Sequence, residues 1–154
     1  MKSLFAFLPC LLALPASAQA AYVLQPGQYE HVLTTDGESV DTGSGTIVDA
    51  WSDKSVTSEC LEGEGERLLA PGIAGDLRCA YRETGRAQGH VTFEMACAYP
   101  TLDMAGTGTL DFERARLDGF DQQITLTGYS GGAETTLRMH LSARRTGACW
   151  PELR

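Results

Sequence analysis

The second half of this chain of 154 residues alternates apolar and polar side chains and is interrupted at short intervals by turns that contain glycine. Successive side chains of a β-strand point to opposite faces, so a turn of suitable length brings the apolar faces of two neighbouring strands together. From Leu77 onward this alternation predicts an antiparallel sheet built from consecutive hairpins. We expect its apolar side chains on one inner face and its charged side chains on a solvated outer face.

Four turns set the expected register of this sheet. Ala87-Gln88-Gly89 and Leu117-Asp118-Gly119 are predicted as three-residue loops, residues 100–103 as a four-residue loop, and Gly131-Gly132 as a two-residue turn. These turns predict the following opposed pairs: Cys79 with Cys97, Tyr81 with Met95, Phe93 with Leu110, Val91 with Phe112, Phe112 with Ile124, Leu110 with Leu126, Leu126 with Leu137, and Ile124 with Met139. All four turns agree on a single inner face.

The first half of the chain is less regular. Strand-like pieces occur at residues 28–35, 46–51 and 55–60, and a polar loop at 36–45 separates the first two. Residues 62–70 are predicted to form a short helix, because their acidic start suits the positive end of a helix dipole. The predicted fold is therefore all-β: an antiparallel meander of about eight strands that forms a small barrel or a strongly bent half-barrel, with one short helix.

Three glycines interrupt the large residues of the expected inner face. Gly106, Gly108 and Gly128 align beside Tyr81 and Met95. Glycines aligned across strands mark a sharp bend or a close approach of other atoms. Because large side chains would otherwise fill this space, the sequence predicts a ligand cavity lined by these five residues.

Four cysteines remain once Cys10, which lies in the N-terminal apolar run, is set aside. The expected register pairs Cys79 with Cys97, since directly opposed residues on neighbouring strands lie within disulfide range. Cys60 then pairs with Cys149 by elimination. A four-cysteine metal site is the alternative, which the wide spacing and an exported context disfavour.

The N-terminus has the pattern of a secretory signal peptide. Lys2 precedes a short apolar run, and small residues follow it. We expect a signal peptide of residues 1–18, or alternatively 1–20, and a single disulfide-bonded β domain over residues 19–154. The apolar run is shorter than the roughly 20 residues that a spanning helix needs. The mature chain is therefore expected in the periplasm, without an integral membrane segment.

The net charge of the mature chain limits the classes of partner that it is expected to bind. Without Lys2, 11 basic residues face 20 acidic ones, which gives a net charge of −9. This balance argues against nucleic acid and against anionic membrane surfaces as partners.

Short motifs in a fixed order connect the chain to a known family. They are Pro26-Gly27-Gln28-Tyr29-Glu30, Cys60-Leu61 before an acidic segment, the hairpin bracketed by Cys79 and Cys97, and the closing residues 143–149. In this order and spacing the chain resembles the small exported bacterial proteins catalogued as domain of unknown function 3617. Tyr29 replaces a tryptophan usual in that family, and Ala148 stands where an acidic residue is common. The resemblance implies no activity, substrate or catalytic residue.

No catalytic constellation is visible in the sequence. His31, His90 and His140 are far apart, and we expect each to be solvated or hydrogen-bonded. Of Arg144 and Arg145, one is expected to pack over the end of the sheet, with anion binding as the alternative. We therefore predict no catalytic, cofactor-binding or metal-ligating residue, and no cofactor.

Two functions are consistent with these observations. We favour a non-enzymatic periplasmic β-domain that binds an apolar small molecule or envelope component inside its bent sheet. The alternative is a protein-interaction module, such as an inhibitor or accessory subunit, whose acidic surface meets a basic periplasmic protein.

Overall fold

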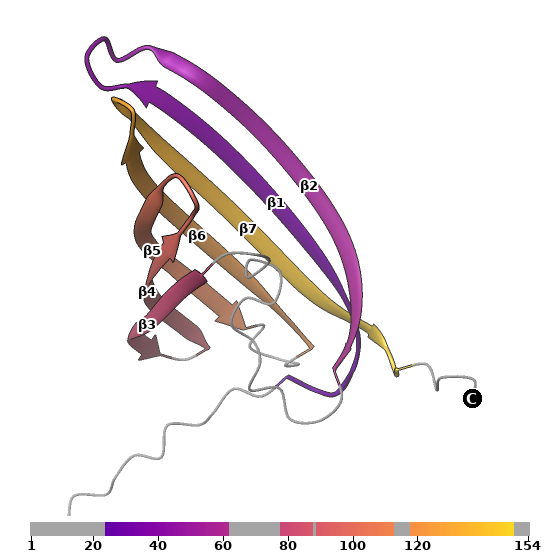
Figure 1. Cartoon of the computed structure of the whole chain (residues 1–154). Coiled ribbons are helices and arrows are strands. Elements are labelled where there is room, and N and C mark those ends of the chain that lie inside the picture. Colours follow the sequence, from indigo (N-terminus) through magenta and orange to yellow (C-terminus); the bar gives the residue numbers. More distant parts are fainter. Residues whose placement is uncertain (1–23, 62–77, 88, 113–117, 150–154) are drawn as a thin grey trace, which may run out of the picture.

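The computed structural model describes residues 24–61, 78–87, 89–112 and 118–149. Seven strands form one antiparallel sheet in the order β2-β1-β7-β6-β5-β4-β3 (Figure 1). Their bounds are β1 Gly27–Asp41, β2 Ile47–Leu61, β3 Arg78–Ala87, β4 His90–Ala98, β5 Asp103–Phe112, β6 Gly119–Ser130 and β7 Ala133–Gly147. The expectation of an all-β antiparallel meander is confirmed.

The sheet is strongly curved but open (Figure 1). Strands β3 to β7 follow one another as neighbours, and the β1–β2 hairpin adds to the free side of β7. Strands β2 and β3 are therefore the two edges, and they do not pair with each other. Of the two predicted forms, a barrel or a strongly bent half-barrel, the closed barrel is wrong, because the N-terminal hairpin extends the sheet past β7 instead of meeting β3.

The described strands number seven instead of eight because two predicted pieces merge. Residues 46–51 and 55–60 belong almost entirely to β2, which continues through the polar segment Ser52-Asp53-Lys54 because each of these residues pairs with β1. The predicted loop at 36–45 is likewise mostly strand, since β1 extends to Asp41 between two neighbours. No helix occurs in the described part of the chain, and the predicted helix at 62–70 lies outside it.

A tight turn joins β1 to β2. The Asp41 carboxylate accepts hydrogen bonds from the backbone nitrogen and the hydroxyl of Ser44, both at 2.7 Å. The hydroxyl bond is the main cause that lowers the pKa of the Asp41 carboxyl below its ordinary value. Gly45 adopts a φ of 69°, which a residue with a side chain rarely does. These contacts reverse the chain without a longer loop.

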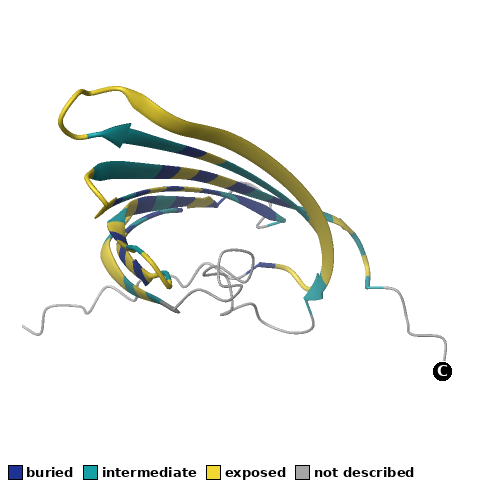
Figure 2. Cartoon of the chain, turned by 45° about the horizontal axis from the view of Figure 1, so that its top comes forward, coloured by how far each residue is buried: buried dark blue, intermediate teal, exposed yellow. Residues whose placement is uncertain are grey.

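The core lies on the inner face of the sheet, as the alternation predicted. Buried and exposed residues form alternating bands along β4, β5 and β6 (Figure 2). The buried core contains Leu24, Tyr29, Val91, Phe93, Met95, Cys97, Met104, Leu110, Phe112, Phe120, Ile124, Leu126, Leu137, Met139, Leu141 and Ala143. Every residue that the expected pairs placed on the inner face of β4 to β7 is therefore buried.

The predicted register is confirmed at the two outer turns of the meander. Cys79 opposes Cys97, and Tyr81 opposes Met95. The loop itself is one residue shorter than predicted, because Ala87 already pairs with His90. A bulge between Glu83 and Gly85 shifts the pairing by one residue and so restores the predicted register at Tyr81 and Cys79. At the other turn, Leu126 opposes Leu137 and Ile124 opposes Met139, across Gly131 and Gly132 with φ values of 59° and 83°.

The register predicted for the two inner turns is wrong by an even number of residues. Phe93 opposes Gly108 instead of Leu110, a shift of two, and Phe112 opposes Phe120 instead of Ile124, a shift of four. An even shift leaves each side chain on its own face, so alternation alone does not distinguish these registers. Packing does, because the Phe93 ring lies directly over the glycine that faces it.

Two disulfides join the expected cysteines. Cys79 and Cys97 are bonded across β3 and β4, with Cα atoms 4.0 Å apart. Cys60 and Cys149 are bonded with Cα atoms 5.5 Å apart. The second bond ties the end of β2 to the residues that follow β7.

Candidate functional site

The glycines of the predicted cavity lie beneath close neighbours. A Cβ atom added at Gly108 would lie 2.4 Å from the Phe93 ring, and one at Gly106 would lie 1.8 Å from the Thr125 carbonyl oxygen. At Gly128 it would lie 2.5 Å from the Asp103 carbonyl oxygen. The Phe93 ring and neighbouring backbone therefore occupy the space beside these glycines.

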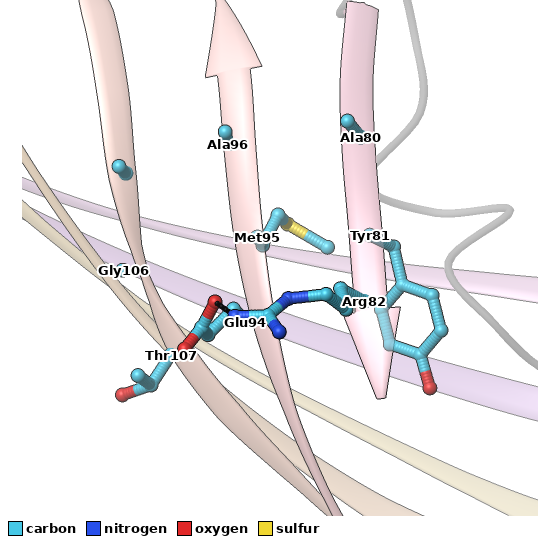
Figure 3. A pocket seen from close by; sticks show the side chains of 9 residues that line it. Ala80, Tyr81, Arg82, Glu94, Met95, Ala96, Gly106 and Thr107 are labelled. Carbon is cyan, nitrogen blue, oxygen red and sulfur yellow. Dashed lines mark hydrogen bonds and ion pairs between the residues drawn. The ribbon is translucent and has the colours of Figure 1, made fainter. Parts of the chain in front are cut away.

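Three of the five predicted cavity residues line a depression over β3, β4 and β5. Tyr81, Met95 and Gly106 contribute to it (Figure 3). The other lining residues alternate with these three and belong to the outer face: Ala80, Arg82, Glu94, Ala96, Ala105 and Thr107. Arg82 donates a hydrogen bond of 2.5 Å to Glu94, in an exposed ion pair. This depression offers a solvated ion pair above small side chains, which is a weak basis for binding.

A different pocket opens on the inner face, toward the β1–β2 turn. Its volume is about 350 Å³, and most of its wall is apolar. The lining residues are Leu33 and Thr35 of β1, Trp51 of β2, Met104 of β5, Thr135, Leu137 and Met139 of β7, and Tyr99, Thr101 and Leu102 of the β4–β5 turn. The lining thus combines β1 and β7 with residues that lie far from them in sequence.

Trp51 forms one wall of this pocket because Gly37 leaves room for its indole. Gly37 pairs with Trp51 on one side and with Leu137 on the other. A Cβ atom at Gly37 would lie 2.4 Å from the indole ring, so a larger residue would displace it. Trp51 remains 48% exposed, so it lies at the wall of the pocket and not in the buried core.

The pocket carries no formal charge. None of its lining residues is acidic or basic. The Thr135 hydroxyl shares a hydrogen bond of 2.9 Å with Ser39, and burial raises the pKa of the Tyr99 phenol, which keeps it neutral. The site therefore favours neutral, apolar groups with an occasional hydrogen bond at the threonines.

The inner face also buries polar atoms without partners. Gln122 is 1% exposed between Leu110 and Leu141, and neither its amide nitrogen nor its amide oxygen has a hydrogen-bond partner among the described residues. The Nε2 atom of His31 is also buried, and no described residue forms a hydrogen bond with it. Burial lowers the pKa of His31, and the nearby Glu59 carboxylate opposes this shift only in part. Gln122 was not predicted from the sequence as a buried residue. The signal was present, because Gln122 lies two residues from both Phe120 and Ile124 and therefore on the same face of the strand.

The motifs at the two ends of the chain meet at one end of the sheet. Gln28 pairs with both Cys60 and Gly147. Tyr29 is fully buried and donates a hydrogen bond of 2.8 Å from its hydroxyl to the Gln25 carbonyl. Arg145 donates from Nε to the Pro26 carbonyl at 2.9 Å. These motifs thus hold β2, β1 and β7 together, which is a structural role.

Arg144 is also engaged within the chain. Its guanidinium donates to the Phe120 carbonyl at 2.9 Å and to the Asp121 carboxylate at 2.7 Å. His140 lies 3.5 Å from the other oxygen of Asp121, and His90 lies 2.5 Å from Asp111. These contacts bind neighbouring strands to one another.

Neither a metal site nor a spanning helix is found among the described residues. No group of three or more His, Cys, Asp or Glu side chains in those ranges is placed to hold a metal ion. The same ranges contain no helix long and apolar enough to cross a membrane.

One comparison with known proteins identifies a family. No curated protein and no solved structure matches the chain. The model of a family described as protein of unknown function, DUF3617, matches residues 24–149, which include the paired end motifs and all four bonded cysteines. The chain belongs to the DUF3617 family.

Proposed function

We propose that this protein is an exported, non-enzymatic β-domain that binds an apolar ligand in the inner-face pocket beside Trp51. The observation that carries the proposal is the uncharged pocket of about 350 Å³ with Trp51, Leu137 and Met139 in its wall. Ligand sites in proteins are typically concave and mostly apolar, with volumes of about 300–1,000 Å³. The pocket lies at the lower end of this range, so it suits a short acyl chain or a single ring system.

The expected affinity is modest. Burial of a methylene group stabilises a complex by about 0.8 kcal/mol, so a chain of about eight methylenes contributes roughly 6 kcal/mol before the entropy of association is subtracted. That gross value corresponds to a dissociation constant of tens of micromolar at best. The binding assay must therefore extend into the millimolar range.

Export is part of the same proposal. The N-terminal pattern of a charged residue, an apolar run and small residues supports it. The two disulfides support it too, since such bonds persist mainly in oxidising compartments. Intact-mass measurement of protein from its native host tests this part, and a mature species that retains Lys2 would contradict it.

Ligand binding is testable by fluorescence in a Trp150→Phe background, where Trp51 is the remaining tryptophan. Titration with decanol or a dansylated fatty acid is expected to change the Trp51 emission. Thr101→Phe fills the pocket from an exposed turn position and is expected to weaken binding at least tenfold. Thr107→Phe, an equally exposed threonine beside the outer-face depression, is the matched control. Absence of binding, or equal loss in both variants, would refute the pocket assignment.

An acidic interaction surface is the second candidate. The exposed strand β2 carries Asp49, Asp53 and Glu59, and the mature chain has a surplus of acidic residues. Complementary charge would attract a basic partner, and added salt would weaken the complex. A complex with a basic protein whose affinity does not change with salt would argue against this candidate.

A further inference from the structure

Strand β2 presents a long edge that no described strand covers. It spans Ile47–Leu61, and only its last two residues, Cys60 and Leu61, are less than exposed. Figure 2 shows it exposed along nearly its whole length. Its unpaired backbone N–H and C=O groups form a template for another strand.

Strand β3, at the opposite edge of the sheet, is better protected against the addition of another strand. Strand β3 is shorter, and a bulge between Glu83 and Gly85 interrupts its pairing with β4. Its exposed residues include Arg82 and Arg86, each in an ion pair. Charge, bulges and short length are the usual means by which proteins blunt a sheet edge. Strand β2 contains no proline, pairs with β1 without a break from Asp49 to Leu61, and has one basic residue, Lys54, besides the acidic Asp49, Asp53 and Glu59.

Apolar side chains concentrate on this unprotected edge. Among the described residues, five large hydrophobic side chains are exposed, and four of them belong to β2: Ile47, Val48, Trp51 and Val56. Val48 and Val56 are 59% and 57% exposed. An exposed, long and apolar edge strand is a site for strand addition.

The sequence of β2 indicates a second copy of itself as the added strand. Two antiparallel β2 strands related by a two-fold axis perpendicular to the sheet keep both inner faces on the same side. The axis then lies midway between the two copies of one residue, which oppose each other directly. With the axis at Asp53, two aspartates oppose each other directly; at Trp51, Asp49 opposes Asp53. With the axis at Lys54, two lysines meet. Like charges directly opposed destabilise a strand pair.

An axis at Ser52 avoids every such conflict. Asp49 then opposes Ser55, Lys54 opposes Ala50, and Val48 opposes Val56 on both sides of the axis. With the axis at Ser55, by contrast, Val56 would oppose Lys54. β-Branched side chains directly opposed on one face stabilise a strand pair.

We infer that the protein forms a two-fold symmetric dimer in which β2 pairs with β2 of a second copy, antiparallel about Ser52. The two curved sheets then continue across the interface with their pockets on the same side. This inference rests on the exposed edge and on the sequence of β2, so it stands whether or not the pocket binds a ligand.

Cysteine crosslinking tests the register. Ser52→Cys places two thiols opposite each other at the axis, within disulfide range, so mild oxidation is expected to give a covalent dimer on a non-reducing gel. Ser58→Cys is the matched control, since it lies on the same exposed strand and the same face. In the inferred register its two copies lie about 40 Å apart and are expected to stay uncrosslinked.

Sedimentation tests the interface in solution. Val48→Lys and Val56→Lys are each expected to raise the dimer dissociation constant at least tenfold, while thermal unfolding shows that the fold is retained. Tyr129→Lys alters the remaining exposed large hydrophobic residue, on β6, and is expected to leave the dimer unchanged. A wild-type protein that sediments as a monomer at all accessible concentrations would overturn the inference. A dimer that resists both valine variants and gives no specific crosslink at position 52 would overturn it as well.

Discussion

At the scale of single residues, the inner face combines an apolar core with a buried glutamine. Gln122 is almost completely buried, and its amide makes no hydrogen bond within the part of the chain that the structure describes. An unsatisfied buried amide costs about 1–3 kcal/mol relative to a satisfied one. Gln122 therefore lowers the stability of the core relative to a leucine of similar volume, which has no polar atoms to satisfy.

Gln122→Leu is therefore expected to raise the free energy of unfolding by about 1–2 kcal/mol, because it replaces an unpaired amide with apolar surface among Leu110 and Leu141. Chemical denaturation of both proteins measures the change. Gln123→Leu, at the neighbouring exposed position, provides the comparison and should stay within about 0.5 kcal/mol of the wild type. A loss of stability in Gln122→Leu would mean that the amide is satisfied in solution.

At the scale of elements, the glycines of β5 determine how the strands fit together. Gly108 lies between Phe93 of β4 and Ile124 of β6, and the Phe93 ring covers it. The ring occupies the place that a side chain at position 108 would take, so this packing requires glycine there. The glycines of β5 are thus part of the packing of the inner face.

Gly108→Val is expected to destabilise the protein by about 1–3 kcal/mol, since its side chain would enter the space of the Phe93 ring. Thermal or chemical unfolding measures the loss. In the double variant Gly108→Val, Phe93→Leu, part of the loss should be recovered because the smaller residue frees space. Gly43→Ala is the control, as a Cβ there makes only ordinary contact at 3.5 Å. An unchanged stability in Gly108→Val would show that the site is open.

At the scale of the whole molecule, contacts between distant segments complete the sheet. Strand β1 pairs along its whole length with β7, more than 90 residues away in the chain, as the Ser39 to Thr135 hydrogen bond illustrates. The Cys60–Cys149 disulfide spans 89 residues and secures the opposite end of β1, where Gln28 pairs with Cys60 and Gly147, whereas Cys79–Cys97 spans 18. The loop-entropy model assigns the long bond about 4.6 kcal/mol and the short one about 3 kcal/mol.

Replacing Cys60 and Cys149 together with alanine is expected to cost more stability than replacing Cys79 and Cys97 together, because the longer loop regains more chain entropy on unfolding. Denaturant titration of the two double variants under identical conditions compares the losses. The reverse order would show that strain or residual structure in the unfolded chain outweighs loop length in this protein.

Patterns in the sequence predicted the class of the fold and the face of the sheet on which each side chain of β4 to β7 lies. Alternation with period two placed Phe93, Leu110 and Leu126 on the inner face regardless of register, and the glycines at 131 and 132 defined one hairpin. Cys79 opposite Cys97 followed from the same parity. These features depend on near neighbours in the chain, so local patterns were sufficient to predict them.

The tertiary structure alone decided the rest. Shifts by two and four residues at β5 preserve the faces, so only the fit of the Phe93 ring over Gly108 separates the correct register from its alternatives. The position of β1 beside β7 depends on long-range hydrogen bonds that no local pattern encodes. The pocket depends on that pairing, because the pairing of β1 with β7 places Leu33 and Trp51 near Leu137 in the pocket wall. An open sheet instead of a barrel follows for the same reason: the hairpin extends one edge and leaves β2 exposed.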